Sequence, residues 1–201
     1  MMQILIAGGW MMVPIVLCSV LGVAIILERL FYFRHLGYET EAKKIITLTE
    51  QGKLTDALAV AEQRQKPLLR VLTAGIMKRD ELPEKAMEAA SLAELARLKR
   101  GLSALDTIIT LGPLLGLLGT IVGMIDSFGI MAESGLGQPH AVTGGVAEAL
   151  VCTAAGIFVA VTTLIPYNYF LAKVEQETGR MEQYATQIES ALAVNTPPRQ
   201  L

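Results

Sequence analysis

The chain has 201 residues, of which 52% are apolar and only 18% are charged, and its mean hydropathy is +0.47. This balance is typical of an integral membrane protein with one polar region and excludes an ordinary soluble globule. A formal net charge of −2 argues against a nucleic-acid partner. The two cysteines, Cys18 and Cys152, both lie in apolar stretches and predict no disulfide framework, no metal site and no cofactor.

The first apolar stretch runs from Ile4 to Leu27 and predicts a transmembrane helix within residues 1–27. No basic flank precedes it, so it does not read as a cleavable signal, and we expect it to remain in the protein. Pro14 is a candidate kink, which a membrane helix tolerates.

Residues 28–105 predict a helical region outside the bilayer that ends in the start of a long helix. Apolar residues recur there every three or four positions, and neither strand alternation nor a phosphate-binding glycine motif occurs. Gly52 and Pro67 mark breaks, and Pro83 marks a helix start with proline in the first turn. Because no proline follows Pro83 until Pro113, we expect this helix to continue straight into the second apolar span.

Two further apolar spans follow, at residues 106–132 and 144–172, joined by a short loop at residues 133–143. The third span carries no charge from Ala149 to Ala172, which exceeds the roughly 20 apolar residues that a membrane helix needs. Residues 173–201 predict a charged helix and a frayed tail.

Basic residues set the expected orientation. Of the 17 Lys and Arg residues, 14 lie between Arg29 and Arg100 and three follow the third span. The positive-inside rule therefore places the large loop and the C-terminus in the cytoplasm, and the N-terminus and the short loop on the other side. The predicted fold is an all-α integral membrane protein with three transmembrane helices, two of them extended into a cytoplasmic helical domain.

Glu148 is the one charged residue at the start of the third span. A charge at the centre of a bilayer costs on the order of 2.5–3.5 kcal/mol, less near an interface, unless it is neutralised, paired or wetted. The neighbouring spans contain no Lys or Arg, so an ion pair within the chain is poorly available. A protonated structural glutamate and a reversible proton carrier both fit, and the chemistry favours the carrier.

Small residues mark the second and third spans as closely packed. Small-xxx-small spacing lets membrane helices approach each other, and the glycines predicted to do so are Gly112, Gly116, Gly119, Gly123 and Gly156. The hydroxyl of Thr120 either bonds a carbonyl in its own helix or serves a hydrated path, and the spacing leaves both open. Thr153 lies about 140° round the helix from Glu148 at 100° per residue.

The remaining polar residues predict no second site. His35 and His140 are solitary and indicate no metal, and Asp126 and Glu133 are expected on a solvated face at the outer end of the second span. A serine or cysteine nucleophile needs a nearby base, and the spans offer no histidine, so we expect no enzyme activity.

Three stretches carry a family resemblance. Leu114–Ile125 reads LLGLLGTIVGMI, Gly144–Gly156 reads GGVAEALVCTAAG and Tyr167–Phe170 reads YNYF. Together with the topology, they resemble the MotA/TolQ/ExbB proton-channel family, and they are most similar to its ExbB members.

The resemblance implies a pentamer of three-span subunits around a dimer of single-span ExbD-like partners, in the bacterial inner membrane with the N-terminus periplasmic. Proton flow through such a complex is expected to energise a TonB-like protein and, through it, outer-membrane transport. The family's pore-facing residues carry over to Thr120, Glu148 and Thr153, and with less weight to Asn168. A TolQ-like envelope motor and a passive membrane scaffold remain alternatives, and the choice between H⁺ and Na⁺ is open.

Overall fold

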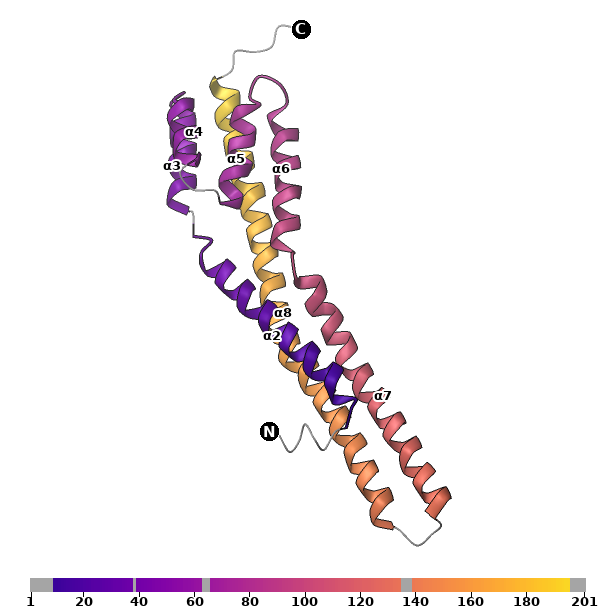
Figure 1. Ribbon diagram of the computed structural model, residues 1–201. Coiled ribbons are helices and arrows are strands. Elements are labelled where there is room, and N and C mark those ends of the chain that lie inside the picture. The colour runs from indigo at the N-terminus through magenta and orange to yellow at the C-terminus, as the bar shows by residue number, and fades with distance from the viewer. Residues whose placement is uncertain (1–8, 38, 63–65, 135–138, 196–201) are drawn as a thin grey trace. The chain divides into compact units, whose positions relative to one another are not determined.

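The computed structural model describes residues 9–37, 39–62, 66–134 and 139–195, which form helices joined by short turns (Figure 1). No strand occurs in these residues, and this confirms the predicted all-α class. The helices are α2 (Met12–Arg34), α3 (Glu39–Glu50), α4 (Leu54–Glu62), α5 (Pro67–Met77), α6 (Pro83–Leu98), α7 (Leu102–Ser134) and α8 (Pro139–Asn195).

The helices group into two compact units. The apolar unit lies within residues 1–30 and 101–170, and the polar unit lies within residues 31–100 and 171–201. The helix α8 contributes its first part to the apolar unit and its last part to the polar unit.

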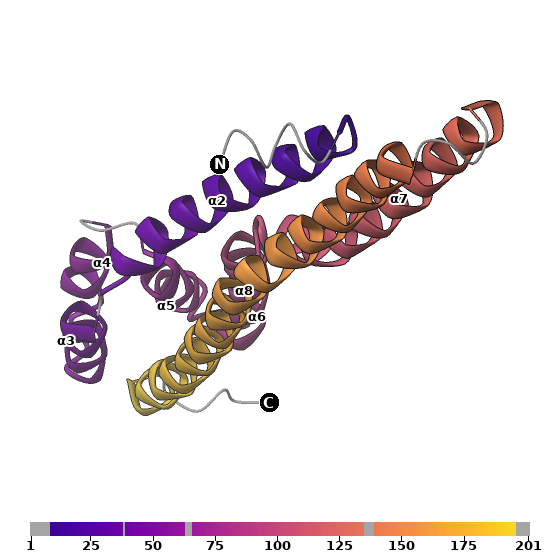
Figure 2. The ribbon, with the colours of Figure 1, turned by 90° about the horizontal axis from the view of Figure 1, so that it is seen from below.

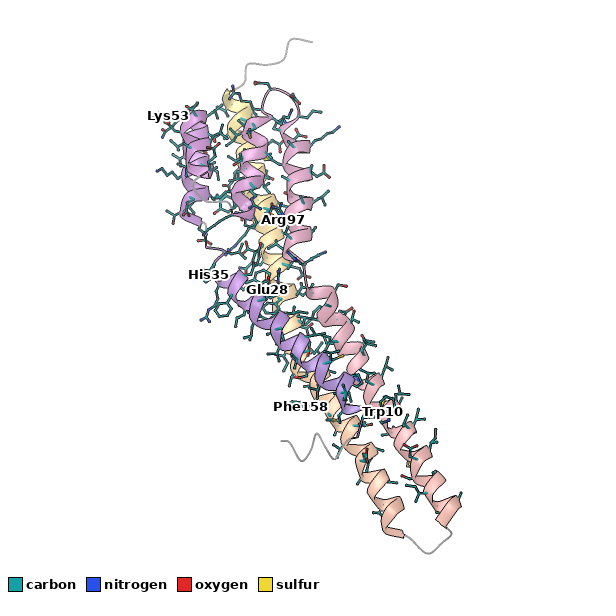
Figure 3. All side chains as sticks on the ribbon, viewed as in Figure 1. Trp10, Glu28, His35, Lys53, Arg97 and Phe158 are labelled. Carbon is teal, nitrogen blue, oxygen red and sulfur yellow. The ribbon has the colours of Figure 1, made fainter. Side chains whose placement is uncertain are left out.

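The apolar unit consists of α2, α7 and the first part of α8, and α7 runs beside α8 in both ribbon views (Figures 1 and 2). Among the residues that the structure describes, three helices are long and apolar enough to cross a membrane, and the apolar unit contains the apolar part of each. The outward surface of the unit is apolar: Phe158 of α8 and Trp10, in the turn before α2, are each 69% exposed (Figure 3). A surface of this kind suits lipid, which needs no polar side chains to cover it.

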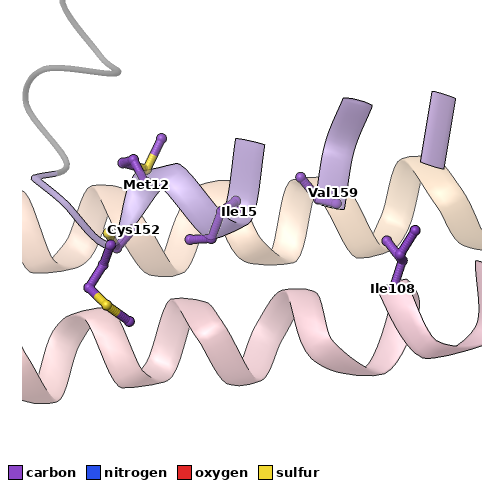
Figure 4. Packing of buried hydrophobic residues seen from close by; sticks show 6 residues of the cluster. Met12, Ile15, Ile108, Cys152 and Val159 are labelled. Carbon is purple, nitrogen blue, oxygen red and sulfur yellow. The ribbon is translucent and has the colours of Figure 1, made fainter. Parts of the chain in front are cut away.

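A small core joins the three helices of the apolar unit. It combines residues at the start of α2 with one residue of α7 and two of α8, as Figure 4 shows. Its buried members are Met11, Met12, Ile15, Ile108, Cys152 and Val159.

The first helix begins later than the apolar stretch does. Gly9 has a left-handed backbone (φ +63°), α2 starts at Met12, and the earlier part of the predicted span lies outside the described residues. Pro14 falls in the first turn of α2, where a proline disturbs no helical hydrogen bond.

The expected unbroken helix from Pro83 into the second span is wrong. The helix α6 ends at Leu98, and α7 starts anew at Leu102 after Gly101, whose φ is +79°. The amide of Lys99 still donates to the carbonyl of Leu95 at 3.0 Å, and Gly101 then takes the left-handed conformation that commonly ends a helix. The break therefore comes from a glycine C-cap and needs no proline.

The polar unit packs α3, α4, α5, α6 and the last part of α8. The helix α5 is its most buried element, with Leu68, Leu69, Val71, Leu72 and Ile76 almost fully inaccessible to solvent. The predicted breaks are confirmed, because α3 ends before Gly52 (φ +73°), α5 begins at Pro67 and α6 begins at Pro83.

Candidate functional site

The helices α7 and α8 approach each other closely along a seam of glycines. A Cβ added to Gly112 would lie 2.8 Å from the carbonyl oxygen of Gly156, and one added to Gly156 would collide with the carbonyl oxygen of Gly112. A Cβ on Gly116 would lie 2.9 Å from the Cα of Thr153. Since the clashing atoms belong to the backbone, no side-chain movement relieves them.

The seam continues toward the connection between α7 and α8. A Cβ on Gly119 would lie 2.7 Å from the Cβ of Cys152, and one on Gly123 would lie 3.0 Å from the Cβ of Ala149. All five glycines for which packing was expected therefore face the other helix. The pairing of low with high residue numbers shows that α7 and α8 run antiparallel.

Glu148 lies beside this seam, at a small cavity of about 30 Å³. A space of roughly 10–15 Å³ holds one water molecule, so this cavity accommodates one or two. It is lined by Trp10, Met11, Gly119, Val122, Gly123, Asp126, Glu148 and Cys152.

The turn before α2 covers one side of the Glu148 carboxylate. A Cβ on Gly9 would collide with Oε1 of Glu148 and would lie 3.1 Å from its Cδ. The left-handed φ of Gly9 favours glycine at this position. The sequence shows only a glycine before Trp10, so the contact between Gly9 and Glu148 could not be predicted from the sequence.

The two threonines do not line the Glu148 cavity. Thr120 donates its hydroxyl hydrogen to the carbonyl of Leu117 at 2.6 Å, in its own helix. Thr153 donates to the carbonyl of Gly116 at 3.0 Å, across the seam. Each hydroxyl oxygen keeps the capacity to accept a hydrogen bond.

Asn168 lies far from Glu148. It is exposed, about 30 Å further along α8 at 1.5 Å per residue and about 200° round the helix. The structure thus brings Glu148 together with Asp126 and leaves the three other predicted pathway residues outside the cavity.

Asp126 was expected only on a solvated face. Its side chain is indeed exposed, as is that of Glu148, but it also borders the Glu148 cavity. The side chains of Glu133 and His140 lie outside the described residues, so those two expectations stay predictions.

Among the described residues, no Lys or Arg lines this cavity. Arg29 is the one Lys or Arg in the described part of the apolar unit, and its guanidinium pairs with Glu28 at 2.6 Å and 2.7 Å. The described residues include no group of three or more His, Cys, Asp or Glu side chains that could hold a metal ion. His35 forms a hydrogen bond with the carbonyl of Phe31 at 2.9 Å (Figure 3).

An apolar unit of three membrane-length helices, with carboxylates beside a glycine seam, is typical of a membrane protein, in which such carboxylates are candidate functional groups. The sequence profile of the MotA/TolQ/ExbB proton channel family matches residues 63–183, and the chain belongs to this family. The predicted resemblance is therefore confirmed.

Relatives of both the ExbB and the TolQ kind match the chain. It is 34% identical over 191 residues to the biopolymer transport protein ExbB-like 3 of Synechocystis sp., covering 88% of this chain and 90% of the relative. It is 35% identical over 108 residues to the Tol-Pal system protein TolQ of Pseudomonas aeruginosa, covering 54% of this chain and 47% of TolQ. It is 28% identical over 123 residues to the biopolymer transport protein ExbB of Xanthomonas campestris pv. campestris, covering 61% and 49%.

Proposed function

We propose that this protein is the proton-channel subunit of an ExbB–ExbD type motor in the bacterial inner membrane. The proton-motive force would drive protons past Glu148, and the resulting work would reach a TonB-like protein and energise outer-membrane transport. The observation that carries the proposal is a glutamate at a water-sized cavity beside the glycine seam, facing a second carboxylate and no Lys or Arg.

The chemistry of the cavity supports a role for Glu148 as a proton carrier rather than as a structural residue. A structural carboxylate near a bilayer is normally neutralised by an ion pair. Glu148 has none of the Lys or Arg partners that would hold it permanently ionised, and it remains exposed in the single chain. It can therefore exchange a proton with water or with a partner's carboxylate.

The seam supports a stable scaffold for such exchange. Close backbone contact between α7 and α8 fixes the register of the two helices, and the hydrogen bond from Thr153 to the carbonyl of Gly116 stabilises the same register. We propose that Thr120 and Thr153 accept hydrogen bonds from water on the side of the seam that a single-span ExbD-like partner would face. A pentameric ring with a periplasmic N-terminus and a cytoplasmic C-terminus is part of the same proposal.

A TolQ-like envelope motor is the second candidate. The match to TolQ of Pseudomonas aeruginosa spans 108 residues at 35% identity. Sequence similarity therefore does not separate an ExbB-like subunit from a TolQ-like subunit. Mass spectrometry of the single-span and periplasmic proteins that co-purify with the chain distinguishes them.

Proton uptake into liposomes tests the proposal. The chain is reconstituted with its single-span partner, and an imposed membrane potential drives uptake for wild type and Glu148→Gln. We expect Glu148→Gln to abolish uptake with the complex intact, because the neutral amide cannot carry a proton. The matched control is Glu175→Gln, an exposed residue further along α8, which should leave uptake unchanged. Equal uptake by Glu148→Gln and wild type would support the passive scaffold instead.

A further inference from the structure

Asp126 shares the Glu148 cavity although it comes from the other helix of the seam. Gly119, Val122 and Asp126 follow one face of α7 at spacings of three and four, and all three line the cavity. Glu148 and Cys152, four residues apart on α8, line it from the opposite side. The two carboxylates therefore border a single space of about 30 Å³.

Asp126 lies nearer than Glu148 to the connection between α7 and α8. Gly123 faces Ala149, and the side chain of Ser127 packs against Gly145, so Asp126 stands level with the residues just before Glu148. The offset is about two residues, roughly 3 Å along the axis. Asp126 is therefore slightly nearer than Glu148 to that connection.

The cavity offers room for water between the two carboxylates. One or two water molecules fit between the carboxylates and can accept from or donate to both. The titratable groups that border the cavity are Asp126, Glu148 and Cys152, while Trp10 and Met11 add no charge.

We propose that Asp126 is the outer carboxylate of the proton pathway and exchanges protons with Glu148 through water in their common cavity. This inference rests on the proposed function of Glu148. It gives Asp126 one effect, which is to relay protons to and from Glu148.

The test compares Asp126→Asn, Asp126→Glu and Asp106→Asn in the reconstituted complex. Asp106 is an exposed aspartate near the start of α7, outside the cavity, and serves as the matched control. We expect Asp126→Asn to slow proton uptake about tenfold, equivalent to about 1.4 kcal/mol on the barrier, and Asp126→Glu to restore most of it. Asp106→Asn should behave as wild type.

The conservative variant separates a relay from a structural role. Asp126→Glu keeps a carboxyl at this position and should restore uptake because it can still exchange a proton. If the role of Asp126 is merely structural, the longer side chain of Asp126→Glu should not restore the uptake that Asp126→Asn loses.

The outcomes separate the two proposals. If Asp126→Asn conducts as wild type, if Asp126→Glu restores nothing, or if Asp106→Asn slows uptake equally, the role of Asp126 is overturned while the loss of uptake in Glu148→Gln still supports the proton channel. If Glu148→Gln conducts as wild type, both proposals fail.

Discussion

The two units hold their helices together by different means. In the apolar unit, α7 and α8 meet through glycines, and the clashing atoms at Gly112 and Gly116 are backbone. In the polar unit, α5 packs through five large apolar side chains that are almost fully buried. Lipid gives apolar side chains no reason to cluster, so close backbone approach has to supply the association. In water, removal of apolar surface supplies it. Substitutions should therefore act on the two units by different rules.

The largest effect is expected from a cavity in the polar unit. Leu72→Ala removes a fully buried side chain of α5 and should destabilise the polar unit by about 2–5 kcal/mol. Hydrogen exchange in the full chain would show faster exchange in α5 and α6 and unchanged protection in α7. The matched control is Met77→Ala, a residue of the same helix that is 69% exposed. Loss of protection in α7 as well would contradict the separation into two units.

A smaller effect is expected from overpacking the seam. Gly116→Ala should destabilise the apolar unit by about 1–3 kcal/mol, because the new Cβ meets the Cα of Thr153. Thermal unfolding in detergent measures it. Gly129→Ala is the control in the same helix, since a Cβ there meets nothing within 4 Å.

A second glycine sharpens this comparison. A Cβ on Gly75 would lie 2.5 Å from the Sδ and 2.7 Å from the Cγ of Met87, which are atoms of a flexible side chain. Gly75→Ala should therefore cost less than Gly116→Ala, because a methionine can change rotamer whereas a helix backbone cannot. Equal costs would show that the seam is no more rigid than the polar core.

The smallest effect is a dependence on pH. Burial raises the pKa of Glu177 above its ordinary 4.5, and nearby Arg180 lowers it in part. A carboxyl with a raised pKa binds its proton more tightly in the folded state, so folding is disfavoured as pH rises from 4.5 through the raised value. Glu177→Gln should remove this dependence and raise the melting temperature at neutral pH relative to wild type. Thermal scans at several pH values measure it, with exposed Glu175→Gln as the control. A wild-type slope in Glu177→Gln would refute this assignment.

Local signals in the sequence predicted the fold class and the glycine seam. Pro67 and Pro83 start helices where proline is favoured, and the glycines of α7 recur at a spacing that reaches α8. The break at Gly101 was missed because the expectation depended on prolines alone. The signal was present: two basic residues followed by glycine are a common helix C-terminus.

The surroundings of Glu148 could not be predicted in the same way. The cover by Gly9 depends on how the start of α2 docks against α8, and the place of Asp126 depends on the register of α7 against α8. The same register decides that Thr153 bonds Gly116 across the seam. No periodicity within one helix fixes such relations between helices. The carboxylate was found from its cost in the membrane, but its neighbours required the structure.

The most direct measurement of the central claim is proton entry into liposomes that hold the chain and its single-span partner. A potassium gradient sets the potential, an internal dye reports pH, and the external medium contains or lacks Na⁺. The account predicts uptake that requires Glu148 and is the same with and without Na⁺. Uptake that persists in Glu148→Gln, or that depends on Na⁺, would contradict a proton path through this residue.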